Sequence, residues 1–296
     1  MSIALFQTLC VVIVSLTLVT MARSTPWKPL LSDYFALAVA GYLGEESCIT
    51  LYHFYQYSPD WNARLVDVPL LVPLIWPLVV LSARQVGQAL WPDAKSPLAR
   101  AAITAALVTF DASLMEVVAV RAGLWSWAEP GHLQVPLIGI LGWGYFALGA
   151  ELVLGQPWRR ARRLWLLLLL APLVTHALIV GSWWICFRHA LRGDLGQASV
   201  SAVAGLGVLS LVAVLWQRRR GHTIPLAIAG PRMIAATLFV ALLLATAPRD
   251  PNLWLQTLAL ALPYLAATSF RPPPPQTPPP STSPFLRNAP LPPPST

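Results

Sequence analysis

The chain has 296 residues, of which 56% are hydrophobic and only 11% are charged. Soluble domains carry about 25% charged residues, so this composition excludes an ordinary soluble enzyme and indicates an integral membrane protein. The net charge of +8 would suit a nucleic-acid partner, but the distribution of the positive residues argues against that function class.

Nine apolar runs follow one another along the chain, and each is close to the roughly 20 residues that a membrane-spanning helix needs. Only the sequence Ala-Pro-Arg-Asp-Pro separates the last two runs, so eight or nine spans are consistent with the pattern. The predicted fold class is an all-α integral membrane protein, a bundle of eight or nine transmembrane helices. The runs cover residues 3–21, 32–52, 66–86, 100–120, 133–154, 164–186, 197–216, 227–247 and 252–270.

Positive residues fall unequally on the two sides of the predicted membrane. With nine spans, the odd-numbered connections and the C-terminal tail hold 15 Lys and Arg residues, whereas the even-numbered connections hold 5. Cytoplasmic segments are enriched in Lys and Arg, which predicts a multi-pass protein of the cell's inner (plasma) membrane, with the N-terminus outside and the tail in the cytoplasm. The 15 residues are Arg23, Lys28, Arg84, Lys95, Arg100, Arg159, Arg160, Arg162, Arg163, Arg218, Arg219, Arg220, Arg232, Arg271 and Arg287.

Four regions are predicted along the chain. Residues 1–31 form the first span, which is expected to be retained rather than cleaved because no positive residue precedes it. Residues 32–155 form a core of spans two to five, and residues 156–270 add further spans. The tail at 271–296 has 12 Pro in 26 residues, and we expect it to be disordered or in polyproline II conformation.

The core contains the same acid-plus-aromatic unit twice. Each copy has a Glu, eight further residues, two aromatic residues one position apart, and a Val-Pro-Leu with a Trp seven residues after the Pro. Both copies begin near the end of one span and finish in the next, which predicts an internal parallel repeat with both loops on the outer face. The matched pairs are Glu46/Glu116, Tyr55/Trp125, Tyr57/Trp127, Val68/Val135, Pro69/Pro136, Leu70/Leu137 and Trp76/Trp143.

Ionisable side chains inside predicted spans are candidates for function. Such a group costs about 2.5–3.5 kcal/mol at the bilayer centre on insertion scales, so it has a role or a buried partner. The alternative for each is a carboxyl that only joins neighbouring helices by hydrogen bonds. The candidates are Glu45, Glu46, Asp111, Glu116, Glu151 and His176.

The repeated aromatic residues suggest a particular chemistry. They belong either to an ordinary interfacial belt or to the wall of a pocket. Ring faces stabilise cations, and a carboxyl beside an apolar cavity tends to stay protonated. An acid next to an aromatic wall therefore suits protonation of an alkene and protection of the carbocation. The residues expected to line such a pocket are Tyr55, Tyr57, Trp76, Trp125, Trp127 and Trp143.

The setting of each acid predicts its role. Glu116 is followed by Val-Val-Ala-Val, a dry environment, so we predict it as the proton donor. Glu46 has polar neighbours and is predicted as the base that orients water. Asp111, in the middle of the same span as Glu116, is a further catalytic candidate.

Other chemistries fit the sequence poorly. There is no phosphate-binding glycine loop and no Gly-x-Ser-x-Gly nucleophile motif, and the five His and three Cys show no metal-ligand spacing. We therefore predict neither a metal nor another cofactor. A proton-coupled carrier stays open, because paired carboxylates and parallel repeats also occur in carriers.

Residues 41–145 resemble a known family. The stretches YQY…VDVPLLVPLIW and EVVAVRAGLWSW…VPLIGILGW are similar to motifs of the bacterial and archaeal carotenoid-biosynthesis membrane proteins that include the carotenoid 1,2-hydratases. The resemblance implies a hydro-lyase that adds water to a terminal double bond of an acyclic carotenoid without a cofactor. The chain departs from the family pattern at CITLYHF, which replaces a Gly-rich stretch, at Val117, which replaces Pro, and at IGIL, which replaces an Asn-Phe-containing stretch.

Three alternatives to a hydratase stay open at this point. The integral-membrane lycopene cyclases also protonate a carotenoid end group and carry paired acids somewhat like Glu45 and Glu46. A non-catalytic isoprenoid or lipid carrier would use the same pocket, and a scaffold would use the acids only for packing. The expected partners are a lipid-soluble isoprenoid, membrane lipids and other carotenoid enzymes, but not nucleic acid.

Overall fold

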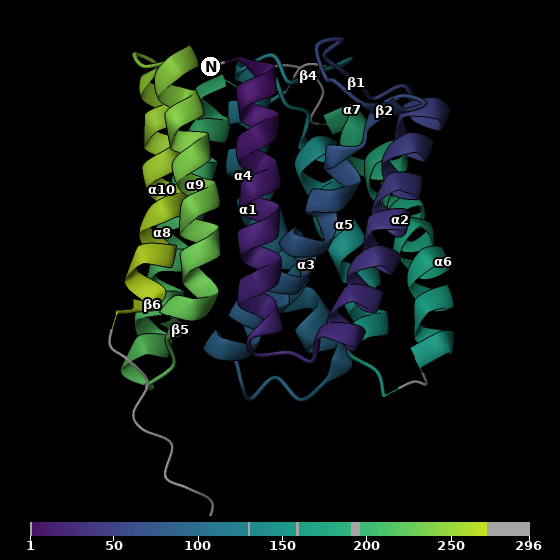
Figure 1. Cartoon of the computed structure of the whole chain (residues 1–296). Coiled ribbons are helices and arrows are strands. Elements are labelled where there is room, and N and C mark those ends of the chain that lie inside the picture. Colours follow the sequence, from purple (N-terminus) through teal and green to yellow (C-terminus); the bar gives the residue numbers. More distant parts are fainter. Residues whose placement is uncertain (1, 130, 158–159, 191–195, 271–296) are drawn as a thin grey trace, which may run out of the picture.

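The structure, a computed structural model, describes residues 2–129, 131–157, 160–190 and 196–270 (Figure 1). The predicted disordered tail at 271–296 lies outside these residues. The helices of the described part are α1 (Ile3–Ala22), α2 (Trp27–Tyr52), α3 (Leu71–Leu90), α4 (Pro97–Arg121), α5 (Leu137–Leu154), α6 (Arg160–Leu178), the π-helix η1 (Ile179–Phe187), α7 (Arg188–Ala190), α8 (Gly196–Arg219), α9 (Leu226–Thr246) and α10 (Pro251–Ala267).

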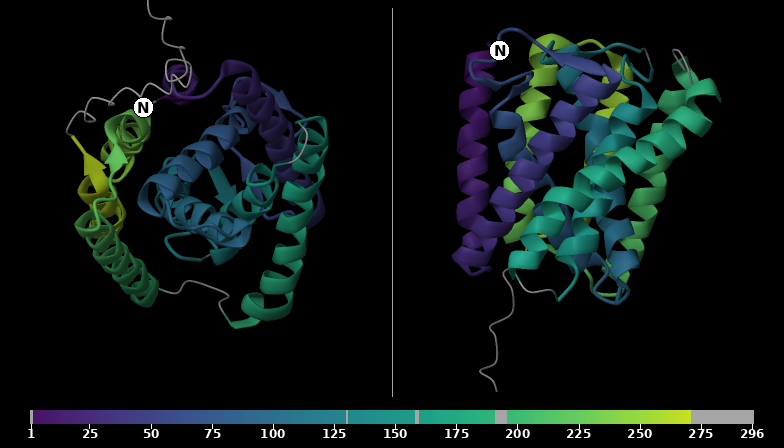
Figure 2. Two further views of the ribbon diagram at one scale, coloured as in Figure 1. Left: turned by 90° about the horizontal axis from the view of Figure 1, so that it is seen from below. Right: turned by 90° about the vertical axis from the view of Figure 1, so that its right-hand side faces the viewer.

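The predicted all-α membrane fold is confirmed. Six helical stretches among the described residues are long and apolar enough to cross a membrane: α1, α4, α5, α6 with η1, α8 and α9. The helices α2, α3 and α10 run beside them in the same bundle and coincide with predicted apolar runs (Figures 1 and 2). The last two predicted runs are separate helices, because α9 ends at Thr246 and Asp250 caps the start of α10.

The two ends of the bundle carry different short strands. The N-terminus lies at one end, together with the sheet of β1 (Tyr55–Tyr57) and β4 (Trp125–Trp127) (Figure 1). The hairpin of β2 (Arg64–Leu65) and β3 (Val68–Pro69) follows β1 at this end. At the opposite end, β5 (Ile224–Pro225) pairs with β6 (Thr268–Ser269), where α9 begins and α10 stops.

Glycines allow several helices to approach closely. A Cβ atom on Gly149 of α5 would lie 2.9 Å from the Ala171 Cα of α6, and one on Gly207 of α8 would lie 2.5 Å from the Ala259 carbonyl oxygen of α10. Lipid gives helices no hydrophobic reason to associate, so close contact at small residues provides much of the packing energy. These contacts join α5 to α6 and α8 to α10.

Several positive residues that the sequence assigned to inner connections lie inside helices and pair with acids of neighbouring helices, among them Arg84 of α3 with Glu151 of α5. Arg232 was assigned to an inner connection from the sequence, but it lies in α9 and forms an ion pair with Asp111 of α4. A charge paired inside the bundle contributes nothing to the excess of positive residues in the connections. The orientation of the termini across the membrane stays a prediction.

Candidate active site

The strands β1 and β4 bring two pairs of aromatic rings together. They are antiparallel, and their register places Tyr55 opposite Trp127 and Tyr57 opposite Trp125. Because alternate side chains on a strand point to the same face, all four rings share one side of this small sheet. The ring centroids are 4.8 Å apart in the Tyr55–Trp127 pair and 5.8 Å apart in the Tyr57–Trp125 pair. One aromatic surface therefore closes this end of the bundle.

Glu116 of α4 accepts three hydrogen bonds from indole N–H groups. Trp125 and Trp127 of β4 donate to its Oε2 at 2.9 and 3.1 Å, and Trp143 of α5 donates to its Oε1 at 2.7 Å. The chain returns from α4 to β4 at Gly123, whose φ of 71° lies in the left-handed region that favours glycine. This turn brings the two strand indoles back over the carboxyl group.

Glu45 of α2 has a corresponding set of partners. Tyr55 and Tyr57 of β1 donate to its Oε2, Tyr57 at 2.8 Å, and the indole of Trp76 in α3 donates to its Oε1 at 2.8 Å. His53 ends α2 in the left-handed conformation and turns the chain into β1. Each acid is thus held by two rings of the following strand and one indole of the following helix.

The structure corrects the sequence match of Glu46 with Glu116. Glu46 lies outside the aromatic surface, where it accepts from the Thr50 hydroxyl at 3.2 Å and from the Asp67 backbone N–H at 3.3 Å. The sequence match failed because it assumed equal spacing from acid to strand. The helix α2 continues seven residues past Glu45, whereas α4 continues five past Glu116, and the connections to β1 and β4 have two and three residues, so Glu45 precedes its strand by ten residues and Glu116 by nine. Glu45 therefore takes the position that spacing alone assigned to its neighbour.

The two halves meet at a pair of indoles. The ring centroids of Trp76 and Trp143 are 4.5 Å apart. Glycines make room for the rings, since a Cβ atom on Gly41 would lie 2.9 Å from Trp76 and one on Gly139 would lie 2.6 Å from Trp127. We call the whole arrangement the acid–aromatic cage: Glu45, Tyr55, Tyr57, Trp76, Glu116, Trp125, Trp127 and Trp143.

The cage forms one end of an elongated apolar cavity of about 520 Å³. The cavity extends from the cage to Ile224 and Thr268 near the opposite end of the bundle. On α3 its lining runs from Val72 to Val86, which at about 1.5 Å per residue corresponds to roughly 21 Å. Its size and its mainly apolar wall suit a long hydrophobic ligand.

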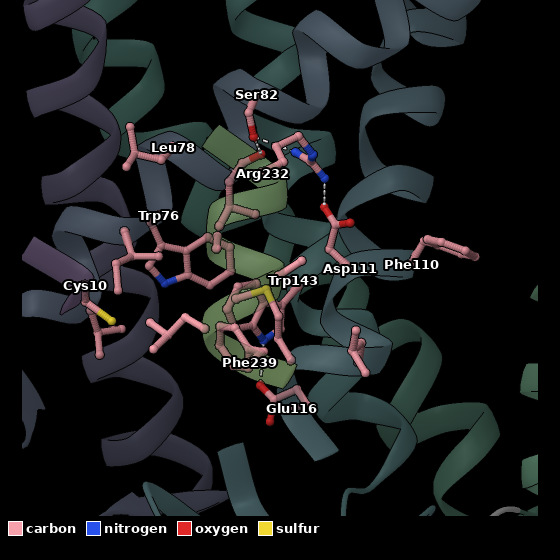
Figure 3. Close-up of a pocket in the computed structure, with 18 of the residues that line it drawn as sticks. Cys10, Trp76, Leu78, Ser82, Phe110, Asp111, Glu116, Trp143, Arg232 and Phe239 are labelled. Carbon is pink, nitrogen blue, oxygen red and sulfur yellow. Dashed lines mark hydrogen bonds and ion pairs between the residues drawn. The ribbon is translucent and has the colours of Figure 1, made fainter. Parts of the chain in front are cut away.

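A second polar group, the arginine cluster, lines the same cavity (Figure 3). It consists of Ser82, Asp111, Arg232 and Tyr264. Arg232 pairs with Asp111 and donates to the Ser82 hydroxyl at 2.5 Å and to the Tyr264 hydroxyl at 2.9 Å. Tyr264 in turn donates to Asp111 at 2.7 Å. Asp111 and Glu116, both predicted as catalytic, therefore line one cavity, although they contact different partners.

The other candidate residues join helices outside the cavity lining. His176 bonds to the hydroxyls of Ser47 and Tyr52 at 2.8 and 2.9 Å, which connects α6 to α2. Glu151 is buried in α5 with Arg84 at 3.5 Å. No cluster of three or more His, Cys, Asp and Glu side chains suited to a metal occurs in the described part of the chain.

Sequence reasoning missed Arg232, Ser82 and Tyr264. A signal for Arg232 was present, since it interrupts the apolar run 227–247, where an unpaired charge is costly. Ser82 and Tyr264 gave no such signal, because isolated hydroxyl groups are common in membrane helices. Glu45 was among the candidate acids, but the sequence match selected its neighbour Glu46 as the counterpart of Glu116.

The two acids of the cage differ in whether their hydrogen-bond partners can accept a hydrogen bond from a protonated carboxyl group. An indole N–H only donates, whereas a phenol hydroxyl both donates and accepts. Burial, followed by the nearby Glu45 carboxyl, raises the pKa of Tyr55 and Tyr57 well above the ordinary value, so both hydroxyls stay neutral. A proton on Glu45 has a hydroxyl acceptor among its partners, but a proton on Glu116 has only indole donors around it.

Comparison with known proteins gives one family match. The family described as carotenoid biosynthesis protein matches residues 2–206, which include the whole acid–aromatic cage but neither α9 nor α10. No curated protein and no solved structure matches the chain.

Proposed function

The chain belongs to the carotenoid biosynthesis protein family, and we propose that it adds water across a terminal double bond of an acyclic carotenoid. The observation that carries the proposal is the cage itself, in which two buried carboxyls and six aromatic rings close one end of a long apolar cavity. The cavity suits the polyene chain, and the cage suits a cationic intermediate at the chain's end.

The first step of the proposed reaction is protonation of the alkene. Protonated Glu45 gives its proton to the chain-side, less substituted carbon of the double bond, and the positive charge develops on the terminal carbon, which carries two methyl groups. The π faces of the rings attract this charge. The Glu116 carboxylate, held by three indole donors, adds a fixed negative charge in a low-dielectric site, where such an interaction is strong.

The second step is capture of the cation by water. The water oxygen forms a bond to the cationic carbon, one of its O–H bonds breaks, and the released proton goes to a carboxylate. The net change is one water added, with no oxidation or reduction. The cavity shields both the cation and the carboxylate from bulk water. This favours capture of the cation by one water molecule over its side reactions.

The proposed roles of the two acids differ from the sequence prediction. That prediction made Glu116 the proton donor and Glu46 the base. Hydrogen-bond partners favour Glu45 as the donor, because the tyrosine hydroxyls can accept from its protonated form. Three indole donors instead suit Glu116 as a carboxylate.

We further propose that the two units are copies of one parallel repeat. The units α2–β1–α3 and α4–β4–α5 each hold an acid with two strand rings and one helix indole, and β1 pairs with β4. Tyrosines in one copy and tryptophans in the other give chemically different surroundings to equivalent acids. This difference separates an acid from a carboxylate within an otherwise matched pair.

The test is expression in cells that accumulate lycopene, with the pigments analysed by mass and retention. We expect the wild-type protein to yield a carotenoid heavier by one water. Glu116→Gln removes the fixed negative charge and should lower product formation by about 10²-fold, the size of effect seen for single electrostatic groups. Equal protein levels in the membrane are the control.

Other outcomes of this experiment would identify a different function. A pigment of unchanged mass but altered retention would identify a cyclase. Unchanged lycopene in cells with well-expressed wild-type protein would contradict both reactions and favour a carrier.

A further inference from the structure

The arginine cluster lies close to the cage along the helix axes. Asp111 precedes Glu116 by five residues in α4, and Ser82 follows Trp76 by six residues in α3. At about 1.5 Å per residue these separations are roughly 7.5 and 9 Å. Both groups line the same cavity, and in Figure 3 Asp111 and Arg232 lie on the far side of Trp143 from Glu116. A small molecule at the cluster would therefore sit next to a chain end held in the cage.

Arg232 has hydrogen-bonding capacity that its partners leave unused. A guanidinium group has five N–H donors. Its Nη2 donates to Asp111 and Tyr264, and its Nη1 donates once, to Ser82. The Nε donor and the second Nη1 donor have no acceptor among the described residues. The Arg232 and Asp111 side chains keep 16% and 13% of their surface exposed, so an oxygen atom entering the cavity can reach them.

The cavity is a place where water needs a dedicated site. A buried water usually makes about three hydrogen bonds, and apolar cavities stay dry. Most of the wall is apolar, and the cage acids already hold three donors each. The arginine cluster offers what the wall lacks, namely free donors for an oxygen lone pair and a carboxylate for a water proton.

We propose that Arg232 and Asp111 bind the water molecule that is added to the carotenoid; this rests on the proposed hydration. Arg232 donates to one lone pair of the water, and Asp111 accepts one of its protons. The second lone pair forms the new C–O bond, while the O–H bond directed at Asp111 breaks and its proton goes to that carboxylate. Glu45, which gave a proton to carbon, recovers one from Asp111 before the next turnover.

Distances are consistent with this arrangement. Reacting atoms lie about 3–3.5 Å apart before reaction, and a water oxygen lies about 2.9 Å from an N–H donor. An alkene end and a water placed in line between the cage acid and the guanidinium therefore span about 10 Å. Along α3, Trp76, which donates to Glu45, and Ser82, which accepts from Arg232, are roughly 9 Å apart along the helix axis. Arg232 and Tyr264 lie beyond residues 2–206 and are not part of the family match, whereas Ser82 and Asp111 lie within it.

The experiment is hydration in D₂O by membranes that contain the protein, with lycopene as substrate. The wild type should form the alcohol with one deuterium on carbon. Arg232→Lys keeps the positive charge beside Asp111 but loses the spare donors. We expect it to form at least tenfold less alcohol, while deuterium still appears in the recovered lycopene, because the cation now returns a proton instead of meeting water.

Matched variants separate this role from a structural one. Arg121 forms an Arg–Asp pair with Asp250 outside the cavity lining, so Arg121→Lys should behave as wild type in both readouts. If Arg232→Lys does not fold, the neutral pair Asp111→Asn with Arg232→Gln removes both charges together, so that no unpaired charge stays buried in the cluster. That pair should also lose alcohol and keep exchange.

Two results would overturn the proposal. One is wild-type alcohol formation by a folded Arg232→Lys protein. The other is loss of alcohol and of deuterium exchange in equal proportion, which would place Arg232 in protonation or substrate binding. If the wild type forms no alcohol and exchanges no deuterium, the proposed hydration fails first, and the water site falls with it.

Discussion

Glu45 and Glu46 are neighbours in the chain but have different surroundings. Successive residues on a helix point about 100° apart. Glu45 therefore faces Trp76, Tyr55 and Tyr57 inside the bundle, whereas Glu46 faces the turn between β2 and β3. The pair allows a comparison in which charge, size and position in the sequence are almost constant.

At the scale of this pair, we predict opposite results for two identical substitutions. Glu45→Gln removes the transferable proton and should lower hydration by about 10²–10⁴-fold, the usual contribution of general acid catalysis. Glu46→Gln should leave hydration within about twofold of wild type, because its bonds lie outside the cavity lining. Pigment mass analysis at matched expression measures both. Greater sensitivity at Glu46 would restore the role predicted from the sequence and contradict the proposed acid.

At the scale of helices, two glycines of the same helix can differ in how closely a neighbouring helix approaches them. In α8, Gly207 faces the α10 backbone, whereas Gly205, two residues earlier, has open space where a Cβ would be. The contact between α8 and α10 matters for the site because α10 carries Tyr264. The packing of α8 against α10 therefore helps to hold Tyr264 in its place in the cavity wall.

This difference predicts the effect of alanine at the two glycines of α8. Gly207→Ala would force a Cβ to 2.5 Å from the Ala259 oxygen, so we expect a loss of about 1–3 kcal/mol in the free energy of unfolding, as for other overpacked sites. Gly205→Ala should change it by less than about 1 kcal/mol, in the stabilising direction. Thermal unfolding in detergent compares them, and equal stability of both variants would contradict the α8–α10 packing.

At the scale of the whole molecule, a group of positive residues lies at the end opposite the site. The cage is at the end with the N-terminus, whereas Arg218, Arg219 and Lys95 lie toward the end where α10 stops. If the positive-rich end faces the cytoplasm, the cage lies in the outer half of the membrane. A substrate would then reach the acids from within the lipid phase.

Two exposed aspartates at opposite ends test this orientation. In a chain with Cys10, Cys48 and Cys186 replaced by Ala, we expect Asp60→Cys to react with a membrane-impermeant maleimide on intact cells. Asp93→Cys should react only after the membrane is opened. The Asp93 ion pair with Arg220 is a surface contact, so its loss should not affect folding. Labelling of Asp93→Cys alone on intact cells would invert the predicted orientation, and labelling of both would contradict the bundle's arrangement.

The sequence by itself determined the membrane class, the positions of the helices and the presence of two acid–aromatic units. These features are local: apolar length decides a span, and a Glu followed by paired aromatics and a Trp lies within 31 residues of chain. The family resemblance rested on the same local motifs, and the match to residues 2–206 agrees with it.

Only the tertiary structure decided which acid faces the rings and which distant charges meet. The helix and the connection that follow each acid differ in length, so Glu45, ten residues before β1, rather than Glu46 corresponds to Glu116, nine residues before β4. Asp111 and Arg232 are 121 residues apart, and no local pattern encodes their pairing. Their contact follows from how α4, α9 and α10 pack around the cavity, because a buried charge in a membrane protein is stable only where packing brings it a partner.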